Sequence, residues 1–238
     1  MSVIDLFDLE RAEWSFDDIH NELGVSRSTL YRYLKTLTDS GFLTSLPGRG
    51  YTLGPRVIEL NYQIMMTDPL IHVARPMMKE LVNGRSGVSL LCRRYKQKVL
   101  CVHQEAATNQ FLTRFERGKA RPLLQGAASL AILAHFPVYQ LTKLYQAQAE
   151  EFKTAGLGSS LAEVRHSLKQ IRQLGWIHTE GQVTAGVTGI AAPIFDSKSD
   201  VIGSLSLTLP ETGITAPHLE QIGERVLFCA RIITNSLN

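Results

Sequence analysis

Two short helices separated by a tight turn are predicted close to the amino terminus. Ser15 and Ser26 each precede an amphipathic stretch and suit helix N-caps, and Gly24 between them supplies a left-handed turn. The second helix is expected from Ser26 to about Thr38. Its apolar residues recur at helical spacing, as Leu30, Tyr33, Leu34 and Leu37. Two β-type segments, residues 42–45 and 51–53, then flank a turn. This order of elements predicts a winged helix-turn-helix.

The other side of the second helix carries side chains suited to duplex DNA. Arginines bind guanine edges and phosphates, and hydroxyl groups contact phosphates or bases. Basic residues cluster here, since Asp39 is the one acid between Gly24 and Ile58, whereas acids dominate before Gly24. The predicted DNA-binding residues are Ser26, Arg27, Ser28, Thr29, Tyr31, Arg32, Lys35 and, on the hairpin turn, Arg49. We therefore predict double-stranded operator DNA as a partner. The alternative is a small helical subdomain with an ordinary solvated charged face.

Composition and cysteine spacing argue against several classes of protein. The 238 residues are 44% hydrophobic and 20% charged, with a net charge of +3, which is ordinary for a globular chain. Cys92, Cys101 and Cys229 are far apart and form no metal-binding motif, so we expect no metal site and no cofactor. We find no signal peptide and no apolar run long enough for a membrane span. We therefore expect a cytoplasmic protein without a membrane partner.

The pattern of apolar residues divides the chain into three parts. Residues 1–54 form the DNA-binding domain, which begins with a short helix over residues 3–9. Residues 55–67 form a linker helix, because apolar residues continue there with few breakers. Residues 68–238 form a larger domain in which helices precede and follow antiparallel hairpins, the α+β class. Its helices are expected at residues 70–81, 127–136, 138–151, 161–174 and 216–236, and its strands at residues 88–95, 98–105, 111–115, 176–180, 187–195 and 201–209.

Residues 201–209 alternate between apolar and mostly hydroxyl-bearing side chains. On a strand, the leucines point to one face, while Ser206 and Thr208 point to the other. The hydroxyl face lies either against solvent or against a ligand pocket. A second feature is Gly126, which is followed by three small residues at a predicted helix start. Unobstructed amide groups there favour an anion, and the same small residues also permit close packing of the helix on the sheet.

Two stretches of this sequence resemble the IclR family of transcription regulators. Residues 23–60 begin LGVSRSTLYRYLKTLTDSGFL, and residues 186–210 are GVTGIAAPIFDSKSDVIGSLSLTLP. The resemblance covers nearly the whole chain, although Ser129 and Leu130 stand where the family commonly has Gly-Lys. It implies a GAF-like effector-binding domain, a homodimer or homotetramer, and a small organic or aromatic acid as effector. The positions that the resemblance assigns to the effector are Ala127, Ala128, Thr179, Gly189, Ser206 and Thr208. We expect a ligand-responsive regulator of a catabolic operon.

An enzyme or a thiol-based redox sensor is the main alternative. Cys101 and His103 are two residues apart and share one face of a predicted strand. A thiol and an imidazole form a nucleophilic pair when they touch and a third group orients them. The sequence offers no Ser/His/Asp set, no paired-carboxylate motif and no phosphate-binding loop. We therefore expect Cys101 to pack in the core, and we expect no enzymatic activity.

Overall fold

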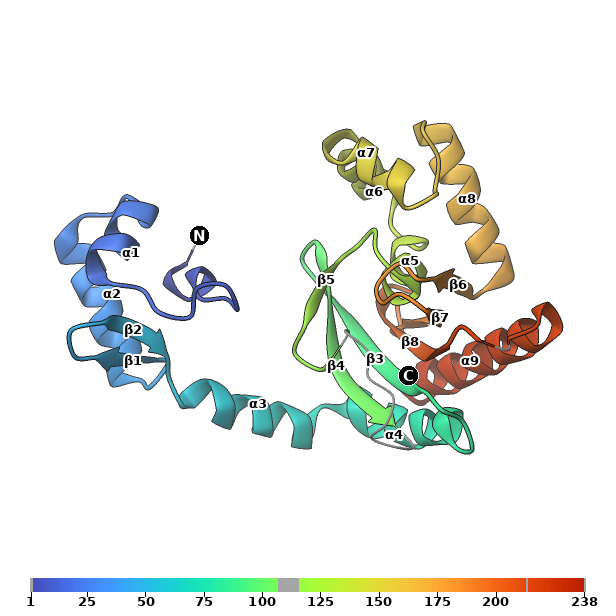
Figure 1. Ribbon diagram of the computed structural model, residues 1–238, viewed down its shortest axis with the longest axis horizontal. Helices are drawn as coiled ribbons and strands as arrows, with labels where there is room; N and C mark the ends of the chain where they lie inside the picture. Colours follow the sequence, from blue (N-terminus) through green and yellow to red (C-terminus); the bar gives the residue numbers. More distant parts are fainter. Residues whose placement is uncertain (1, 107–115, 213, 238) are drawn as a thin grey trace. The chain divides into compact units, whose positions relative to one another are not determined.

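The computed structural model describes residues 2–106, 116–212 and 214–237. The chain divides into two compact units, Met1–Asp68 and Pro69–Asn238 (Figure 1). The helix predicted as a linker over residues 55–67 groups with the first unit, and the strand predicted over residues 111–115 lies outside the described residues. Within the described part of the chain, every helix is too short or too polar to cross a lipid bilayer.

The first unit combines short helices with a two-stranded hairpin. Its elements are η1 (Val3–Leu6), α1 (Phe16–Leu23), α2 (Arg27–Asp39), β1 (Leu43–Leu46), β2 (Gly50–Leu53) and α3 (Arg56–Thr67). As predicted, Ser15 and Ser26 cap α1 and α2, because their hydroxyl oxygens accept from the Asp18 amide at 3.1 Å and the Thr29 amide at 3.3 Å. Gly24 ends α1 with φ 64°. The helix predicted over residues 3–9 is shorter, since η1 is a four-residue 3-10 helix.

A small apolar cluster holds the first unit together. Ile19, Leu30, Leu34 and Leu43 are at most 1% exposed, and they join α1, α2 and β1. The buried stripe of α2 is narrower than predicted, because Tyr33 is 50% exposed. Its ring instead borders a surface hollow that Val3, Val25 and Leu37 also line.

Within the described residues of the second unit, six strands form one antiparallel sheet. Its strands are β3 (Val88–Tyr95), β4 (Lys98–Ala106), β5 (Ala120–Pro122), β6 (Ile177–Glu180), β7 (Val187–Phe195) and β8 (Val201–Pro210), in the order β5-β4-β3-β8-β7-β6. Its helices are α4 (Pro69–Val82), α5 (Ala127–Leu133), α6 (Val138–Ala147), α7 (Ala149–Thr154), α8 (Leu161–Leu174) and α9 (Ala216–Ser236). The sequence did not predict β5, a three-residue strand that pairs with β4.

The two faces of the sheet are covered by different helices (Figure 1). Leu205 and Leu207 on β8 belong to the apolar core that includes α4 and α9. The alternate residues of β8 face the α5 side, where the Ser204 hydroxyl donates to the Ala128 carbonyl oxygen at 2.9 Å. Both faces of β8 are therefore buried, so the hydroxyl-bearing face does not lie against bulk solvent.

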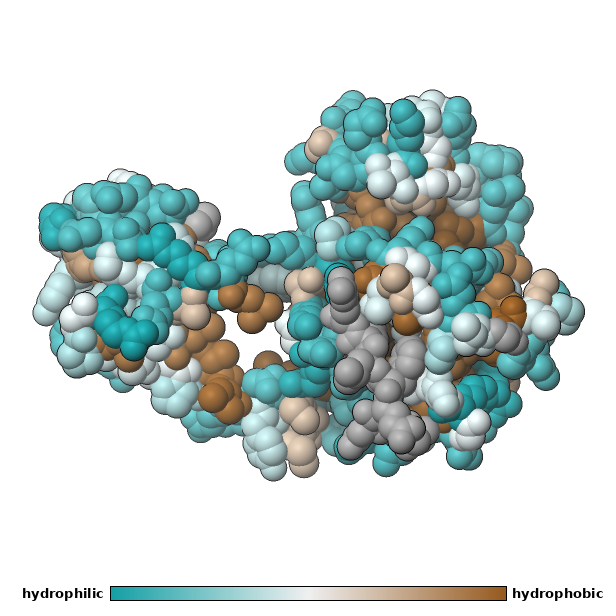
Figure 2. Space-filling model, viewed as in Figure 1, coloured by the Kyte–Doolittle hydropathy of each residue, from teal (hydrophilic) through white to brown (hydrophobic). Residues whose placement is uncertain are grey.

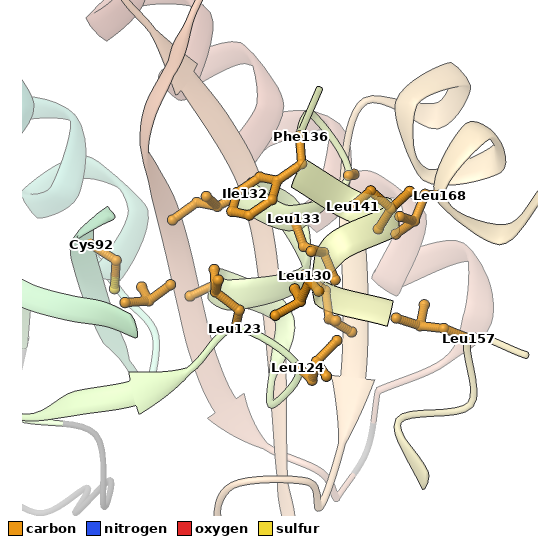
Figure 3. Packing of buried hydrophobic residues seen from close by; sticks show 14 of the residues in the cluster. Cys92, Leu123, Leu124, Leu130, Ile132, Leu133, Phe136, Leu141, Leu157 and Leu168 are labelled. Carbon is orange, nitrogen blue, oxygen red and sulfur yellow. The ribbon is translucent and has the colours of Figure 1, made fainter. Parts of the chain in front are cut away.

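A second apolar core fills the space around α5 and beneath α6, α7 and α8. Figure 3 shows its side chains, among them Leu130 and Leu133 of α5 together with Leu141 and Leu168. The single helix predicted over residues 138–151 is instead two helices, because the backbone leaves helical geometry at Gln148 (φ −141°, ψ 40°). The second of these, α7, carries the fully buried Phe152 into this core.

Candidate DNA-binding surface and ligand pocket

The polar edge of α2 lies at the surface of the first unit. We call it the recognition edge; it consists of Ser26, Arg27, Ser28, Thr29, Tyr31, Arg32 and Lys35. All of these residues are exposed except Thr29, which is half-buried. Leu30 and Leu34 anchor the opposite side of the helix in the core. The amino-terminal part of α2 therefore presents hydrogen-bond donors outward, as insertion into a major groove requires.

The hairpin that follows α2 is attached to the segment before α1. The Trp14 amide donates to the Tyr51 carbonyl oxygen at 3.0 Å, and the Tyr51 amide donates to the Trp14 carbonyl oxygen at 2.8 Å. Gly50 lies under this contact, where a Cβ atom would be 2.2 Å from the Trp14 carbonyl oxygen. Arg49 is exposed at the adjacent turn. These hydrogen bonds hold the base of the wing, so that the position of Arg49 relative to α2 is restricted.

Several of these cations are paired with acids of the first unit. Arg27 Nη1 lies 2.8 Å from Asp17 Oδ1, and Lys35 Nζ lies 3.2 Å from Asp39 Oδ2. Arg49 pairs with Glu13. Among the described residues, the side chain of Arg32 makes no ion pair or hydrogen bond. Exposed pairs of this kind contribute little to stability, so DNA phosphates can compete for the same cations.

A pocket opens between the sheet and α5 in the second unit. About 450 Å³ within it is free of protein atoms, a volume that includes its open mouth. All six positions predicted for the effector line it, namely Ala127, Ala128, Thr179, Gly189, Ser206 and Thr208. The remaining lining residues are Leu90, Gln125, Gly126, Gln182, Val183, Thr184 and Val187. Among the described residues, the lining therefore contains amide groups, hydroxyl groups and apolar surface but no charged side chain.

The amide groups at the start of α5 are not free, contrary to the expectation from the sequence. The Ala127 amide donates to the Thr179 hydroxyl oxygen at 3.1 Å, and the Gly126 amide donates to Gln182 Oε1 at 3.1 Å. The carboxamide of Gln125 in turn donates to the Gln182 carbonyl oxygen at 2.9 Å. A ligand oxygen that uses the two amides must therefore replace side chains of the protein.

Gly189 keeps the middle of the pocket open. A Cβ atom there would lie 3.6 Å from the Ala127 Cβ atom and 3.7 Å from Thr179 Oγ1. Any larger side chain at this position would extend from β7 into the cavity. Thr179 faces the pocket while the adjacent Glu180 is exposed, as the alternation of side chains on β6 requires.

Residues 181–186 form a loop over this pocket that no sequence pattern assigned to the site. Gln182, Val183 and Thr184 of this loop contribute to the lining. A signal that could have pointed to it is the pair of glycines at its ends, Gly181 and Gly186, which both have positive φ (64° and 73°) in the structure.

Comparison with protein families decides the identity of the chain. Residues 63–235 match the family model described as the bacterial transcriptional regulator IclR C-terminal domain, and residues 1–47 match the IclR helix-turn-helix domain. The chain belongs to the IclR family of transcriptional regulators. This confirms the resemblance and the predicted fold class, an amino-terminal helix-turn-helix followed by an α+β domain.

Individual relatives of this IclR-family regulator are distant but extend over nearly its whole length. The transcriptional repressor IclR of Escherichia coli is 21% identical over 220 residues, which is 91% of this chain and 80% of the repressor. A putative IclR regulator from a Silicibacter species superposes with a TM-score of 0.81 at 22% identity, over 99% of this chain and 93% of that one. An IclR homologue from Microbacterium hydrocarbonoxydans, solved with 4-hydroxybenzoate, has a TM-score of 0.70 at 22% identity and 99% and 95% coverage.

The thiol chemistry considered as an alternative finds no support in this IclR-family regulator. The Cys101 thiol donates to the main-chain carbonyl oxygen of His103 at 3.4 Å, while His103 Nε2 lies 2.9 Å from Glu105 Oε1. Burial raises the pKa of Glu105, but hydrogen bonds from His103 and Arg75 outweigh it and leave the pKa below its usual value. Burial also raises the pKa of Cys92, the strand partner of Cys101, which disfavours a reactive thiolate. Among the described residues, no cluster of His, Cys, Asp or Glu could hold a metal ion.

Proposed function

We propose that this regulator binds operator DNA through the recognition edge and Arg49, and that a small organic acid bound in the pocket controls it. The supporting observation is the pocket itself: six positions from four separate elements, α5, β6, β7 and β8, line one cavity. We further propose that it acts in the cytoplasm on a catabolic operon, and we expect no catalytic activity.

The lining of the pocket favours an acid with a single carboxylate. Hydroxyl and amide donors can solvate one carboxylate, whereas a second buried negative charge would need a cation that the lining does not supply. The apolar residues Leu90, Val183 and Val187 suit a ring or a short hydrocarbon body. The Microbacterium relative solved with 4-hydroxybenzoate supplies a molecule of this type.

Thermal unfolding in the presence of acids tests the effector. We expect 4-hydroxybenzoate or a similar monocarboxylate to raise the melting temperature, and 4-hydroxybenzamide and terephthalate to raise it less. Thr208→Val removes a pocket hydroxyl with little change in shape and should weaken acid binding about tenfold, as expected for a hydrogen bond to a charged group. Thr188→Val is the matched control, because Thr188 is also buried in the sheet but does not line the pocket. Stabilisation by amines or sugars and never by acids would contradict the proposed effector class.

Arg32 is the residue that best tests the proposed DNA contact. Its guanidinium is exposed on the recognition edge, and among the described residues it has no partner to lose. Arg32→Ala should weaken operator binding by about 1–3 kcal/mol if it contacts a base edge. Arg231→Ala, an exposed arginine on α9, removes the same charge from the second unit and should leave affinity nearly unchanged. Equal gel-shift titrations for Arg32→Ala and wild type would remove Arg32 from the DNA-binding set.

We propose a homodimer or homotetramer, with α3 as the linker helix that couples effector binding to the paired recognition helices. One short helix contacts too few base pairs for adequate specificity, so two copies are needed. The helix has no buried residue, and Ile58, Tyr62 and Met66 at spacings of four are more than half exposed. Figure 2 shows hydrophobic surface over the start of this segment. Light scattering of the purified chain tests the oligomer, and a monomer at micromolar concentration would contradict it.

A further inference from the structure

The loop that covers the pocket contacts the segment before α5 at Gln182. Gln182 makes two of its contacts with the segment before α5: its side-chain oxygen accepts from the Gly126 amide and its main-chain oxygen accepts from the Gln125 carboxamide. The base of the loop is closed separately, because the Gly181 amide donates to the Val187 carbonyl oxygen at 3.0 Å. The side chain of Gln182 can therefore leave the Gly126 amide while the base of the loop stays paired.

Gln182 also lies between two cavities. A second hollow, bounded by α8 and β6, is lined by apolar residues that include Ile171, Leu174 and Trp176. Thr179 and Gln182 line both this outer cavity and the pocket. Figure 2 shows hydrophobic surface between α8 and the rest of the unit, on the side where the outer cavity lies. Movement of the Gln182 side chain would therefore extend the pocket toward this second, open hollow.

We propose that Gln182 is an internal competitor of the effector and sets the length of acid that the pocket accepts. The inference rests on the proposed function, because it concerns the same pocket. In the ligand-free protein, the side-chain oxygen of Gln182 occupies the Gly126 amide that an effector oxygen would use. A short acid must break this hydrogen bond to bind there. A longer acid must in addition move Gln182 out of its path to the outer cavity.

Two substitutions separate this role from a merely structural one. Gln182→Ala removes the competing oxygen and the partition, so short acids should bind about three- to tenfold more tightly and longer acids should gain more. Gln182→Glu keeps an oxygen at the Gly126 amide and adds a negative charge, so acids should bind more than tenfold more weakly, whereas neutral carboxamides should be affected less. A structural residue would lower stability and all affinities together. Gln173→Ala, on the exposed side of α8 and outside both cavities, is the matched control.

Amide hydrogen exchange and calorimetry carry the test. Exchange at Gly126, measured without ligand, should rise at least tenfold in Gln182→Ala and stay unchanged in Gln173→Ala; unchanged exchange in Gln182→Ala would overturn the proposed blocking contact. Titration then compares 4-hydroxybenzoate with 4-hydroxycinnamate, which is two carbons longer. If Gln182→Ala increases the affinity for the longer acid more than the affinity for the shorter one, the result supports the inference. An equal increase for both acids, or a loss of affinity for both, overturns it. If neither acid nor any shorter homologue binds any variant, the proposed function fails, and the exchange result still decides the blocking contact.

Discussion

The two units of this regulator assemble their functional residues in opposite ways. The recognition edge and Arg49 come from one helix and the hairpin that follows it, and nearly all of these residues are exposed. The pocket takes residues from α5, β6, β7 and β8, which are far apart in the sequence, and encloses them beneath a loop. DNA brings its own shaped surface to the protein, so a short local motif suffices. A small effector must be surrounded, which requires residues that only tertiary folding brings together.

Charge follows the same division. The first unit carries guanidinium and ammonium groups that pair with acids at its surface, as Arg27 does with Asp17. The residues that the structure describes around the pocket of the second unit include no charged side chain. A polyanion such as DNA is attracted by exposed cations, whereas a buried charged side chain without a partner is costly, so the pocket offers hydroxyl and amide groups to the proposed carboxylate instead.

The largest expected effect tests whether the two units unfold independently. Leu30 is fully buried in the first unit, and Leu30→Ala should reduce the stability of that unit by about 2–5 kcal/mol. Calorimetry should show a lower first transition and an unchanged second one, together with loss of operator binding and retention of acid-induced stabilisation. Leu168→Ala, equally buried in the second unit, should produce the converse result. If either variant shifts both transitions equally, the two units do not unfold independently.

The sequence predicted the first unit well because its signals are local. Ser15, Gly24 and Ser26 fix the ends of α1 and α2 within a few residues, and the structure confirms them. The pocket positions followed from family resemblance and from the alternation along β8, since no local pattern distinguishes a buried hydroxyl face from a solvated one. Gln182 was missed for the same reason, because its partners Gln125 and Gly126 are more than fifty residues away. The break at Gln148 was missed because the drive to bury Phe152 overrides the helical pattern.

The stability of the second unit should depend on pH through His135, and the first unit should not share this dependence. Burial and then the positive charge of Arg172 lower the pKa of His135 in the second unit from 6.5 to about 4. Below pH 6.5 the unfolded chain takes up a proton at this histidine, whereas the folded chain does not. The contribution of His135 to the stability of the second unit is therefore complete above pH 6.5 and is lost as the pH falls toward 4. Because His135 is partly exposed, we expect a loss of about 1–2 kcal/mol from the second unit.

Urea unfolding of wild type and His135→Asn at pH 7 and pH 5 measures this contribution. The difference in stability between the two pH values should shrink in the variant, and the first unit should respond equally in both proteins. An identical pH dependence of the second unit in wild type and variant would show that His135 does not titrate in this way.

Helix capping offers a sharper test, because Ser26 belongs both to the fold and to the recognition edge. Ser26→Ala removes the acceptor for the Thr29 amide and should reduce stability by about 1 kcal/mol. Ser26→Asp keeps a good cap but places a carboxylate beside DNA phosphates, so stability should persist while operator affinity falls about tenfold. Ser160→Ala removes the corresponding cap of α8 in the second unit and should affect stability alone. Full operator affinity in Ser26→Asp would place Ser26 outside the DNA interface.

The smallest effect concerns the ion pair between Asp17 and Arg27, whose side chains are 72% and 64% exposed. Stability should barely change in Asp17→Asn, because an exposed pair contributes little. Operator affinity should rise about two- to fivefold at low salt, for two reasons. Arg27 no longer has to leave the Asp17 carboxylate to bind a phosphate, and the negative charge of Asp17 no longer repels the DNA. The gain should disappear at high salt, where screening removes both terms. Glu150→Gln on α7 makes the same change of charge in the second unit and should leave affinity unaltered. If both variants increase operator affinity equally, the change in net charge alone explains the effect, and the Asp17–Arg27 pair has no part in it. A gain confined to Asp17→Asn would show that α1 restrains the recognition edge in the absence of DNA.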